Sequence, residues 1–172
     1  MGVLNIEIKA KSENQTEIRK ILKSKNAEYK GTDHQVDTYF KAENGRLKLR
    51  EGNIENNLIH YIRENKKGPK QSKIILFKSE PHSTLKKILT SAIGILTVVD
   101  KQREIYFIEN VKFHVDTVDK LGSYIEIEAI DNDGSIGKEK LLSQCEYYLD
   151  LFNIPKNNLI PDSYSDLILQ KE

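Results

Sequence analysis

The chain has 172 residues, of which 38% are hydrophobic and 31% are charged. This length suits one domain and excludes an assembly of several modules. The hydrophobic content suffices for a packed core and excludes a disordered chain. Lys and Arg total 27 against 26 Asp and Glu, so the formal net charge of +1 provides no global field toward nucleic acid or anionic membranes.

The single cysteine, Cys145, excludes an internal disulfide and a zinc site with several thiolates, and it favours a reducing compartment. No apolar run approaches the length of a membrane span, and Glu7 interrupts the region where a signal peptide needs its apolar stretch. We therefore expect a cytoplasmic protein that does not bind membranes.

The first part of the chain predicts a strand, a helix and a hairpin. Residues 3–11 alternate between apolar and polar side chains, which is the period of a half-buried strand. Helical spacing follows from 14 to about 25. The runs 35–41 and 46–51 alternate again on either side of Glu43-Asn44-Gly45, and Asn-Gly favours a tight turn because it tolerates positive φ.

The rest of the chain adds strands and three helices. Further strand signals lie at 58–63, 73–78, 95–99, 103–108, 111–118 and 124–130. Eight or so strands in one small domain predict a barrel or a strongly curved sheet. Helical spacing returns at 85–92, at 141–152 and at 164–168 after Pro161, and we expect these helices to dock on the surface of the sheet.

Charges of one sign gather on the polar faces of these strands. Glu126 and Glu128 share one strand, whereas Lys48 and Arg50 share another. A solvated outer face is the ordinary interpretation, although such faces usually intersperse the two signs. Two like charges about 4 Å apart repel by roughly 4 kcal/mol at an effective dielectric near 20, a cost that a ligand of opposite charge would offset. Carboxylates suit a hard cation and basic groups suit phosphate, so the pattern indicates a metal-bound polyphosphate.

Several short motifs occur in a particular order along the chain. They are Asn5-Ile-Glu-Ile-Lys-Ala-Lys, Asp37-Thr-Tyr-Phe, Gly45-Arg-Leu-Lys-Leu-Arg, Tyr61-Ile-Arg with Gly68-Pro-Lys, Lys101-Gln-Arg, and Asp116-Thr-Val-Asp-Lys-Leu-Gly-Ser-Tyr-Ile-Glu-Ile-Glu. Together they resemble the CYTH domain of the triphosphate tunnel metalloenzymes, a superfamily that includes class IV adenylate cyclases, thiamine triphosphatases and inorganic tripolyphosphatases. The resemblance covers nearly the whole chain, down to Ser163-Tyr-Ser-Asp-Leu-Ile.

The resemblance implies a β-dominated α+β fold. Residues 1–172 would form a single tunnel-barrel domain, a closed eight-stranded antiparallel β-barrel with helices packed outside. Charged side chains would line the tunnel. The aliphatic sides of the strands would face the helices, and they comprise Leu4, Ile6, Ile8, Leu47, Leu49, Ile125 and Ile127.

The resemblance also implies roles for the charged residues. The metal, Mg²⁺ or Mn²⁺, would be held by Glu7, Glu126 and Glu128. The triphosphate would be bound by Lys9, Lys48, Arg50, Arg63, Lys101 and Arg103, of which Lys9, Arg50 and Arg103 would be catalytic. Asp116 matches an acidic position to which no role is assigned. The chain departs from the family's Glu-x-Glu-x-Lys motif at its first position, where it has Asn5.

We therefore expect a metal-dependent enzyme that acts on a triphosphate and resembles class IV adenylate cyclase, which converts ATP to cyclic AMP and pyrophosphate. One alternative is a triphosphatase that hydrolyses inorganic triphosphate or thiamine triphosphate. Another is a non-catalytic nucleotide- or polyphosphate-binding protein, which Asn5 favours. A carrier of apolar ligands fits poorly with the charged strand faces, and no aromatic platform for nucleic acid accompanies the basic residues. We expect a monomer or a homodimer.

Two other features receive ordinary interpretations. The four histidines, at 34, 60, 82 and 114, show no zinc-type spacing. A place in the lumen is one interpretation of His114, and a common strand histidine is the ordinary one. The basic run from Lys66 to Lys70 could guard a tunnel mouth, and a solvated loop is its ordinary interpretation.

Overall fold

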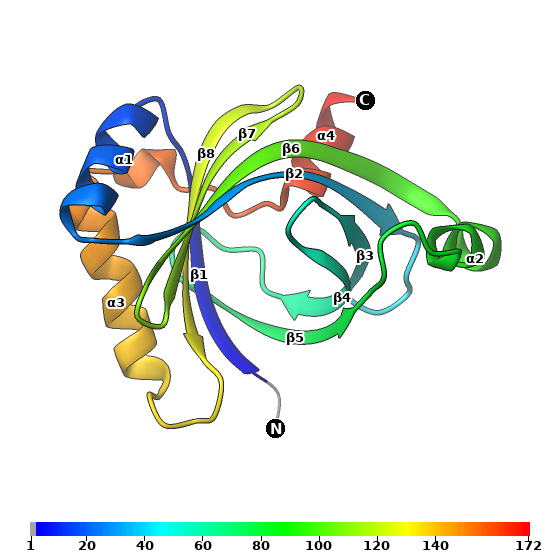
Figure 1. Ribbon diagram of the computed structural model, residues 1–172, viewed down its shortest axis with the longest axis horizontal. Helices are drawn as coiled ribbons and strands as arrows, with labels where there is room; N and C mark the ends of the chain where they lie inside the picture. The colour runs from blue at the N-terminus through cyan, green and yellow to red at the C-terminus, as the bar shows by residue number, and fades with distance from the viewer. Residues whose placement is uncertain (1–2) are drawn as a thin grey trace.

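The computed structural model describes residues 3–172, which form eight β-strands, four α-helices and one short 3-10 helix (Figure 1). In chain order these are β1 (Val3–Lys11), α1 (Gln15–Ser24), β2 (Glu28–Phe40), β3 (Arg46–Glu51), β4 (Asn56–Arg63), β5 (Lys70–Lys78), α2 (Leu85–Ile93), β6 (Ile95–Ile108), β7 (Val111–Val118), β8 (Gly122–Asp131), α3 (Lys138–Leu151), η1 (Lys156–Asn158) and α4 (Tyr164–Lys171).

The strands close into one barrel in the order β1-β5-β4-β3-β2-β6-β7-β8. Every strand is antiparallel to both of its neighbours. Closure removes the unpaired edges that an open sheet would present to solvent. The expected fold, a β-dominated closed barrel with helices outside it, is confirmed.

The predicted element boundaries differ from the structure mainly at the two longest strands. The runs 95–99 and 103–108 belong to one strand, β6, because Asp100 and Gln102 stay paired with β2. Polar residues between the runs interrupt the apolar pattern without interrupting the hydrogen-bonded ladder. β2 begins at Glu28, well before the predicted 35, because its first half is a largely exposed ribbon with weak hydrophobic periodicity.

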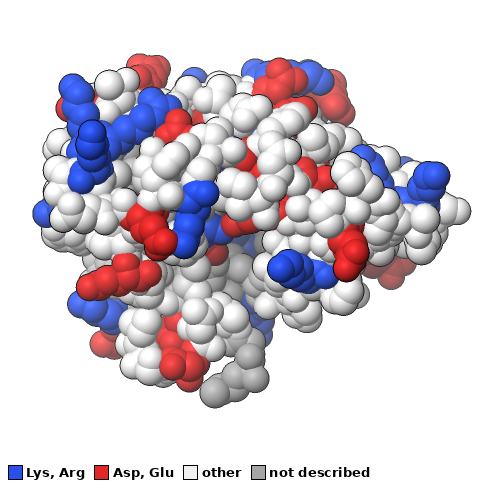
Figure 2. Space-filling view, viewed as in Figure 1, with Lys and Arg blue, Asp and Glu red and all other residues white. Residues whose placement is uncertain are grey.

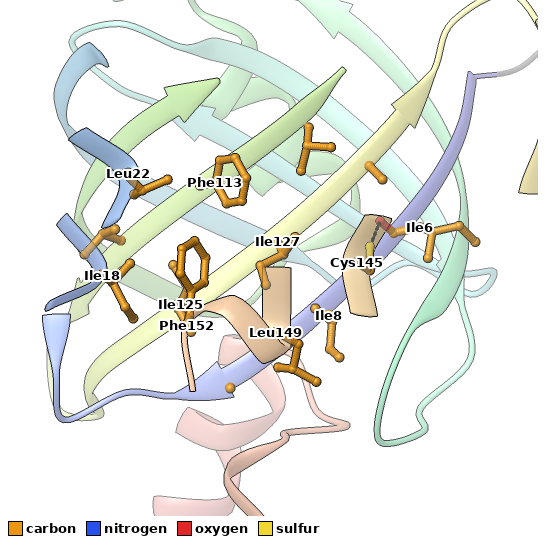
Figure 3. Close-up of a cluster of buried hydrophobic side chains, with 14 of the residues drawn as sticks. Ile6, Ile8, Ile18, Leu22, Phe113, Ile125, Ile127, Cys145, Leu149 and Phe152 are labelled. Carbon is orange, nitrogen blue, oxygen red and sulfur yellow. Dashed lines mark hydrogen bonds between the residues drawn. The ribbon is translucent and has the colours of Figure 1, made fainter. Parts of the chain in front are cut away.

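The main hydrophobic core lies outside the barrel, between its surface and helices α1 and α3 (Figures 1 and 3). Figure 3 shows Ile18, Leu22, Leu149 and Phe152 of the helices against the strands, and the strand side chains include Ile6, Ile8, Phe113, Ile125 and Ile127. The aliphatic sides of β1 and β8 therefore face helices, as expected. Leu49 of β3 is also buried, but it lies outside this cluster.

Cys145 belongs to this core. Its side chain is fully buried, and its Sγ donates a hydrogen bond to the carbonyl oxygen of Ile6 at 3.3 Å. Burial raises the pKa of the thiol to about 12, so Cys145 is a core residue rather than a nucleophile.

A second cluster forms where α4 meets one end of the barrel. Tyr39, Tyr61 and Tyr124 of the strands pack there with Tyr164 and Ile168 of α4. The rings of Tyr124 and Tyr164 have centroids 5.2 Å apart in an edge-to-face arrangement. Part of the barrel interior is therefore aromatic, and charged side chains do not line all of it.

The segment that leads into α4 is attached to the same end of the barrel. Lys70 donates hydrogen bonds to the carbonyl oxygens of Ile160 and Pro161 at 3.0 and 2.9 Å. The interpretation of Lys66 to Lys70 as a solvated loop is therefore wrong for Lys70, which begins β5 and is 1% exposed. Ser163 and Asp166 then start α4 with a reciprocal capping box. We call this end the closed end, and we call the opposite end, where β4 begins and β5 finishes, the open end.

The molecular surface carries intermingled charges. Figure 1 places α2 on the opposite side of the barrel from α1 and α3. Figure 2 shows Lys and Arg interspersed with Asp and Glu over the visible face, in keeping with the formal net charge of +1. Within residues 3–172, no helix combines the length and apolarity that crossing a membrane requires.

Candidate active site

The barrel encloses a cavity of about 260 Å³ that charged side chains line. Strand alternation directs every second residue inward, and this parity brings all the predicted site residues to the cavity wall. They are Glu7, Lys9, Lys48, Arg50, Arg63, Lys101, Arg103, Glu126 and Glu128. The structure therefore brings the predicted residues together, while their roles toward a ligand stay predictions.

Asp37 organises the basic side chains on one wall. Its two carboxylate oxygens accept hydrogen bonds from Arg50 Nε and Nη2, both at 2.9 Å. They also accept from the ammonium groups of Lys48 at 3.0 Å and Lys101 at 2.9 Å. Burial raises the pKa of Asp37, but the charges of Arg50 and Lys101 outweigh it and hold the pKa well below its usual range. One ionised carboxylate thus fixes three cations.

Lys101 has an unusual protonation equilibrium. Its side chain is 1% exposed, and this burial lowers the pKa of its ammonium group to about 7. Arg103 and Arg50 lower the pKa further, while Asp37 opposes them. The ammonium and amine forms of Lys101 are therefore both populated near neutral pH.

Asp116 positions Arg103. Arg103 Nε and Nη2 donate to the two Asp116 oxygens at 2.8 and 2.7 Å, and the Tyr164 hydroxyl donates to Asp116 at 2.7 Å. Arg103 also lies 3.3 Å from Glu126. Asp116, to which the sequence assigned no role, is thus the residue that orients Arg103 and connects α4 to the cavity.

Lys9 and Arg63 lie toward the closed end. Lys9 Nζ is 3.4 Å from Glu126, donates to the carbonyl oxygen of Asp162 at 3.3 Å and lies 4.0 Å from the centre of the Tyr164 ring. Arg63 forms an ion pair with Glu7 through Nη1. Its Nε and Nη2 are buried and have no hydrogen-bond partner among residues 3–172. Two nitrogen atoms of Arg63 can therefore donate hydrogen bonds to an anion in the cavity.

The predicted metal ligands occupy adjacent positions on β1 and β8. Glu7 is the register partner of Glu128, and Asn5 donates a hydrogen bond to Glu128. Burial raises the pKa of Glu128, and the negative charges of Glu7 and Glu126 add to the rise although Lys112 opposes it. The Oδ1 of Asn5 is buried without a partner in the described part of the chain.

These features fit a hard divalent cation, which takes oxygen ligands and would relieve the repulsion among the carboxylates. Glu7, Glu128 and Asn5 would hold it, and the third predicted ligand, Glu126, lies beside them in ion pairs with Lys9 and Arg103. In the structure as it stands, no group of three or more His, Cys, Asp or Glu side chains within residues 3–172 is arranged to bind a metal ion. Each carboxylate contacts a basic or amide group instead.

The expectation that charges segregate by sign is wrong. Asp37 lies among Lys48, Arg50 and Lys101, and Glu126 lies between Lys9 and Arg103. Burial raises the pKa of Glu126, but Arg103 and Lys9 outweigh burial and hold that pKa well below its usual range. Pairing across strands therefore neutralises the charges that are alike along a strand. An anionic ligand must therefore compete with Asp37 and Glu126 for the basic side chains, because the cavity has no region lined by charges of one sign only.

Sequence reasoning missed several residues of the cavity wall. Lys112 lines it and shares the strand parity of His114, whose place in the lumen was the alternative interpretation, so alternation along β7 was the available signal. Glu55 also lines it and accepts a hydrogen bond from Arg50 at 3.0 Å. Glu55 lies in a loop, which Asp33 holds by accepting three backbone N–H bonds. No periodicity marks such a loop residue.

His114 is more than an ordinary strand histidine. Its Nδ1 lies 3.2 Å from Glu126, and its buried Nε2 has no partner among residues 3–172. Burial lowers the pKa of His114 to about 4, with Arg103 adding to the effect and Glu126 opposing it. The imidazole is therefore neutral at pH 7 and donates its Nδ1 proton to Glu126.

The fold and the charged lumen define a class of antiparallel tunnel proteins, and comparisons with known proteins agree. The CYTH domain model matches residues 4–160. A protein of Methanocaldococcus jannaschii named "Putative adenylate cyclase" is 29% identical over 182 aligned positions, which cover 96% of this chain and 98% of the relative.

Solved structures share the fold over nearly the whole chain. A Pyrococcus horikoshii protein superposes with a TM-score of 0.76 at 22% identity, covering 95% of this chain and 98% of its own. A protein of Hippeastrum, described as a "Putative adenylyl cyclase" with a dominant triphosphatase activity, superposes with a TM-score of 0.63 at 14% identity, covering 98% and 95%. This chain belongs to the CYTH domain family of triphosphate tunnel proteins.

Proposed function

We propose that this protein is a divalent-cation-dependent enzyme that acts on a triphosphate, with conversion of ATP to cyclic AMP and pyrophosphate as the leading reaction. The observation that carries the proposal is the convergence of basic side chains from four strands on one cavity. They are Lys9, Lys48, Arg50, Arg63, Lys101 and Arg103, which we call the basic clamp. Guanidinium and ammonium groups are the side chains that suit phosphate oxygens.

The basic clamp is held in place before a ligand arrives. Asp37 orients three of its members, and Asp116 orients Arg103. Preorganised donors cost little reorganisation when charge develops on phosphate oxygens during reaction, so their contribution is greatest in the transition state. Arg63 retains two nitrogen donors that have no partner within residues 3–172 for the same purpose.

A divalent cation, Mg²⁺ or Mn²⁺, would be held by Glu7 and Glu128 with the free Oδ1 of Asn5, and Glu126 lies beside them. When bound, the cation supplies positive charge to the phosphate oxygens and to the oxygen that attacks phosphorus. Asn5 adds an oxygen ligand without a negative charge. The affinity for metal is then lower than in a site with a carboxylate at that position.

Two product patterns follow from two positions of attack. If the ribose 3′-hydroxyl attacks the α-phosphorus, the products are cyclic AMP and pyrophosphate. If water attacks the γ-phosphorus, the bond to the bridging oxygen breaks, and the products are orthophosphate and the diphosphate that leaves, which is ADP when the substrate is ATP. Membership of the CYTH family supports the triphosphate substrate. The name of the M. jannaschii protein mentions a cyclase, and the description of the Hippeastrum protein mentions both a cyclase and a dominant triphosphatase activity.

The test is a substrate panel of ATP, GTP, thiamine triphosphate and inorganic triphosphate with Mg²⁺ and with Mn²⁺, scored separately for cyclic nucleotide, pyrophosphate and orthophosphate. Glu128→Gln is expected to lower turnover by roughly 10²-fold or more while the protein stays folded. Glu146→Gln on the exposed surface of α3 is the control. Undiminished turnover in excess chelator would end the metal-dependent interpretation.

A second candidate function is a non-catalytic triphosphate-binding protein. Asn5 in the metal-binding motif and the pairing of every cavity carboxylate favour it. Tight binding of a triphosphate without any product, at saturating Mg²⁺ and Mn²⁺, would select this function over the enzyme.

A further inference from the structure

Glu55 places a carboxylate across the open end of the barrel. It lies in the turn between β3 and β4, and its Oε2 accepts a hydrogen bond from Nη1 of Arg50 at 3.0 Å. Its Oε1 accepts a hydrogen bond from the ammonium group of Lys112 on β7. In the barrel order, β2 and β6 separate β3 from β7. The Glu55 side chain therefore connects two walls of the cavity that are not adjacent.

The donors that Glu55 occupies are of the kind that binds phosphate. Arg50 gives Nε and Nη2 to Asp37 and directs Nη1 to Glu55, while Lys112 forms an ion pair with Glu55. Burial raises the pKa of Glu55, but Arg50 and Lys112 outweigh burial and hold that pKa below its usual range, so the carboxylate is ionised at pH 7. Carboxylate and phosphate oxygens compete for the same guanidinium and ammonium groups. An anionic group of the protein thus lies where an anionic group of a ligand would bind.

The backbone that carries Glu55 is held in place. Asp33 accepts hydrogen bonds from the backbone N–H groups of Asn53, Ile54 and Glu55 at 2.6, 2.9 and 2.9 Å. A Cβ on Gly52 would lie 2.7 Å from both carboxylate oxygens of Asp33, so the loop passes Asp33 more closely than a residue other than glycine allows. The Glu55 carboxylate can therefore leave its partners by rotation of its side chain, without movement of the loop.

Glu55 is easier to displace than Asp37, the other carboxylate that contacts Arg50. The Glu55 side chain is 19% exposed, whereas that of Asp37 is 1% exposed and accepts hydrogen bonds from three cations. A carboxylate that turns from the cavity into water regains its hydration, which offsets the loss of its ion pairs. An anion that enters from the open end therefore displaces Glu55 and leaves Asp37 in place.

We propose that Glu55 is an internal competitor of the substrate. A triphosphate that enters the cavity displaces the Glu55 carboxylate from Arg50 and Lys112, and both basic groups then bind phosphate oxygens. The proposal rests on the proposed function and adds Lys112 to the groups that bind phosphate. Each binding event breaks the two ion pairs of Glu55, so the protein binds triphosphate more weakly than the same basic groups would without Glu55.

The test is calorimetric titration of inorganic triphosphate, with Mg²⁺ present, into the wild type, Glu55→Gln and Glu51→Gln. Glu51 is the matched control, because it is the register partner of Asn56, next to Glu55, and pairs with Lys86 outside the cavity. Both variants remove one negative charge from the same end of the barrel. Glu55→Asp is a further variant that keeps the charge and shortens the side chain. Thermal melting checks that each variant folds.

We expect Glu55→Gln to bind triphosphate roughly tenfold more tightly than the wild type, and Glu51→Gln to keep the wild-type affinity. Glu55→Asp should have an affinity between those of the wild type and Glu55→Gln, because the shorter carboxylate holds Lys112 less firmly. Lys112→Ala should weaken binding more in the Glu55→Gln protein than in the wild type, since in the wild type Lys112 must first lose its carboxylate partner.

Three results would overturn the internal competitor and leave the proposed function intact. They are an affinity of Glu55→Gln no higher than that of a wild type that binds, an equal gain in Glu51→Gln, which would assign the effect to net charge, and additive effects of Lys112→Ala and Glu55→Gln. If triphosphate binds to neither the wild type nor Glu55→Gln, the proposed function fails, and this inference fails with it.

Discussion

Asp37 shows how a single residue determines the electrostatics of the cavity. It is 1% exposed and accepts hydrogen bonds from three cations. Its negative charge offsets the repulsion among these cations and allows them to lie close together. The sequence placed Asp37 in a motif, and the predicted hairpin puts it directly across from Arg50. The pairing of Asp37 with Arg50 could therefore be predicted from the register of the hairpin. The nearly complete burial of Asp37 could not.

Asp37→Asn should strongly destabilise the fold, because the variant leaves Lys48, Arg50 and Lys101 close together without their counter-charge. We expect the free energy of unfolding to fall by about 3 kcal/mol, the scale for removing one partner of a buried ion pair. Urea denaturation measures it. Asp100→Asn is the control, since Asp100 pairs with His34 on the exposed surface. A loss no larger than that of the control would mean that water already screens the Asp37 cluster.

Lys101 should take up a proton when a triphosphate binds at pH 8. Burial lowers the pKa of Lys101 to about 7, so the amine is mostly neutral at pH 8 before a triphosphate binds. A polyanion beside Lys101 raises that pKa. Calorimetric titrations in buffers of different ionisation enthalpy measure the uptake. Lys101→Arg should abolish it, because a guanidinium stays charged at this pH. Equal uptake in both proteins would assign the proton to another group.

The same lowered pKa has a consequence for stability. The unfolded chain binds more protons than the folded chain between pH 7 and Lys101's ordinary value near 10.5, so Lys101's contribution to the free energy of unfolding rises with pH across that window. Below pH 7 the ammonium group is charged in both states, and its burial penalty is present in full.

Asn5 should determine how much metal the protein needs. Asn5→Glu adds a carboxylate next to Glu128, so we expect half-maximal activity at a lower Mg²⁺ concentration with unchanged products. Asn5→Ala removes the oxygen and should raise the requirement. Activity titrated against Mg²⁺ measures both. If the two variants leave the requirement unchanged, Asn5 is not at the metal site, and the alignment of the N-terminal motif is wrong.

At the scale of elements, α4 connects the end of the chain to the cavity. Tyr164 is the link, because its hydroxyl donates to Asp116 while its ring lies under Lys9. Helical spacing after Pro161 predicted this helix, but nothing in its periodicity shows that it covers one end of a barrel. For the strands, the sequence pattern and the observed hydrogen-bonded pairing agreed in some elements and differed in others. Alternation predicted β1 and β3 over their full lengths, and it failed within β6, where pairing with β2 continues past polar residues.

Tyr164→Phe removes one buried hydrogen bond while keeping the ring. We expect the free energy of unfolding to fall by about 1 kcal/mol, and turnover to fall as well because Asp116 holds Arg103 less firmly. Urea denaturation and the activity assay measure the two effects. Tyr147→Phe on α3 is the control, since Tyr147 is largely exposed. Unchanged turnover together with lowered stability would limit α4 to a structural role.

For the whole molecule, the barrel places its hydrophobic core outside and its charges inside. Strand parity could be read from the sequence, so the nine predicted site residues all reach the cavity wall. The ion pairs between these residues could not be predicted from the sequence. They depend on which strands that are distant in the sequence become adjacent in the barrel, as β1 and β8 do. Glu55 was not predicted for a related reason. It reaches the cavity from a loop whose conformation depends on hydrogen bonds to Asp33, which is distant in the sequence.

The central claim is that the basic clamp binds a triphosphate together with a divalent cation. Calorimetric titration of inorganic triphosphate tests it most directly, because every candidate substrate contains these phosphates. With Mg²⁺ we expect one ligand per chain, and Arg63→Ala should weaken binding by roughly tenfold or more because it removes donors that lack other partners. Lys67→Ala in the exposed loop should keep wild-type affinity. Absence of binding to the wild type, or equal affinities in Arg63→Ala and Lys67→Ala, would contradict the claim.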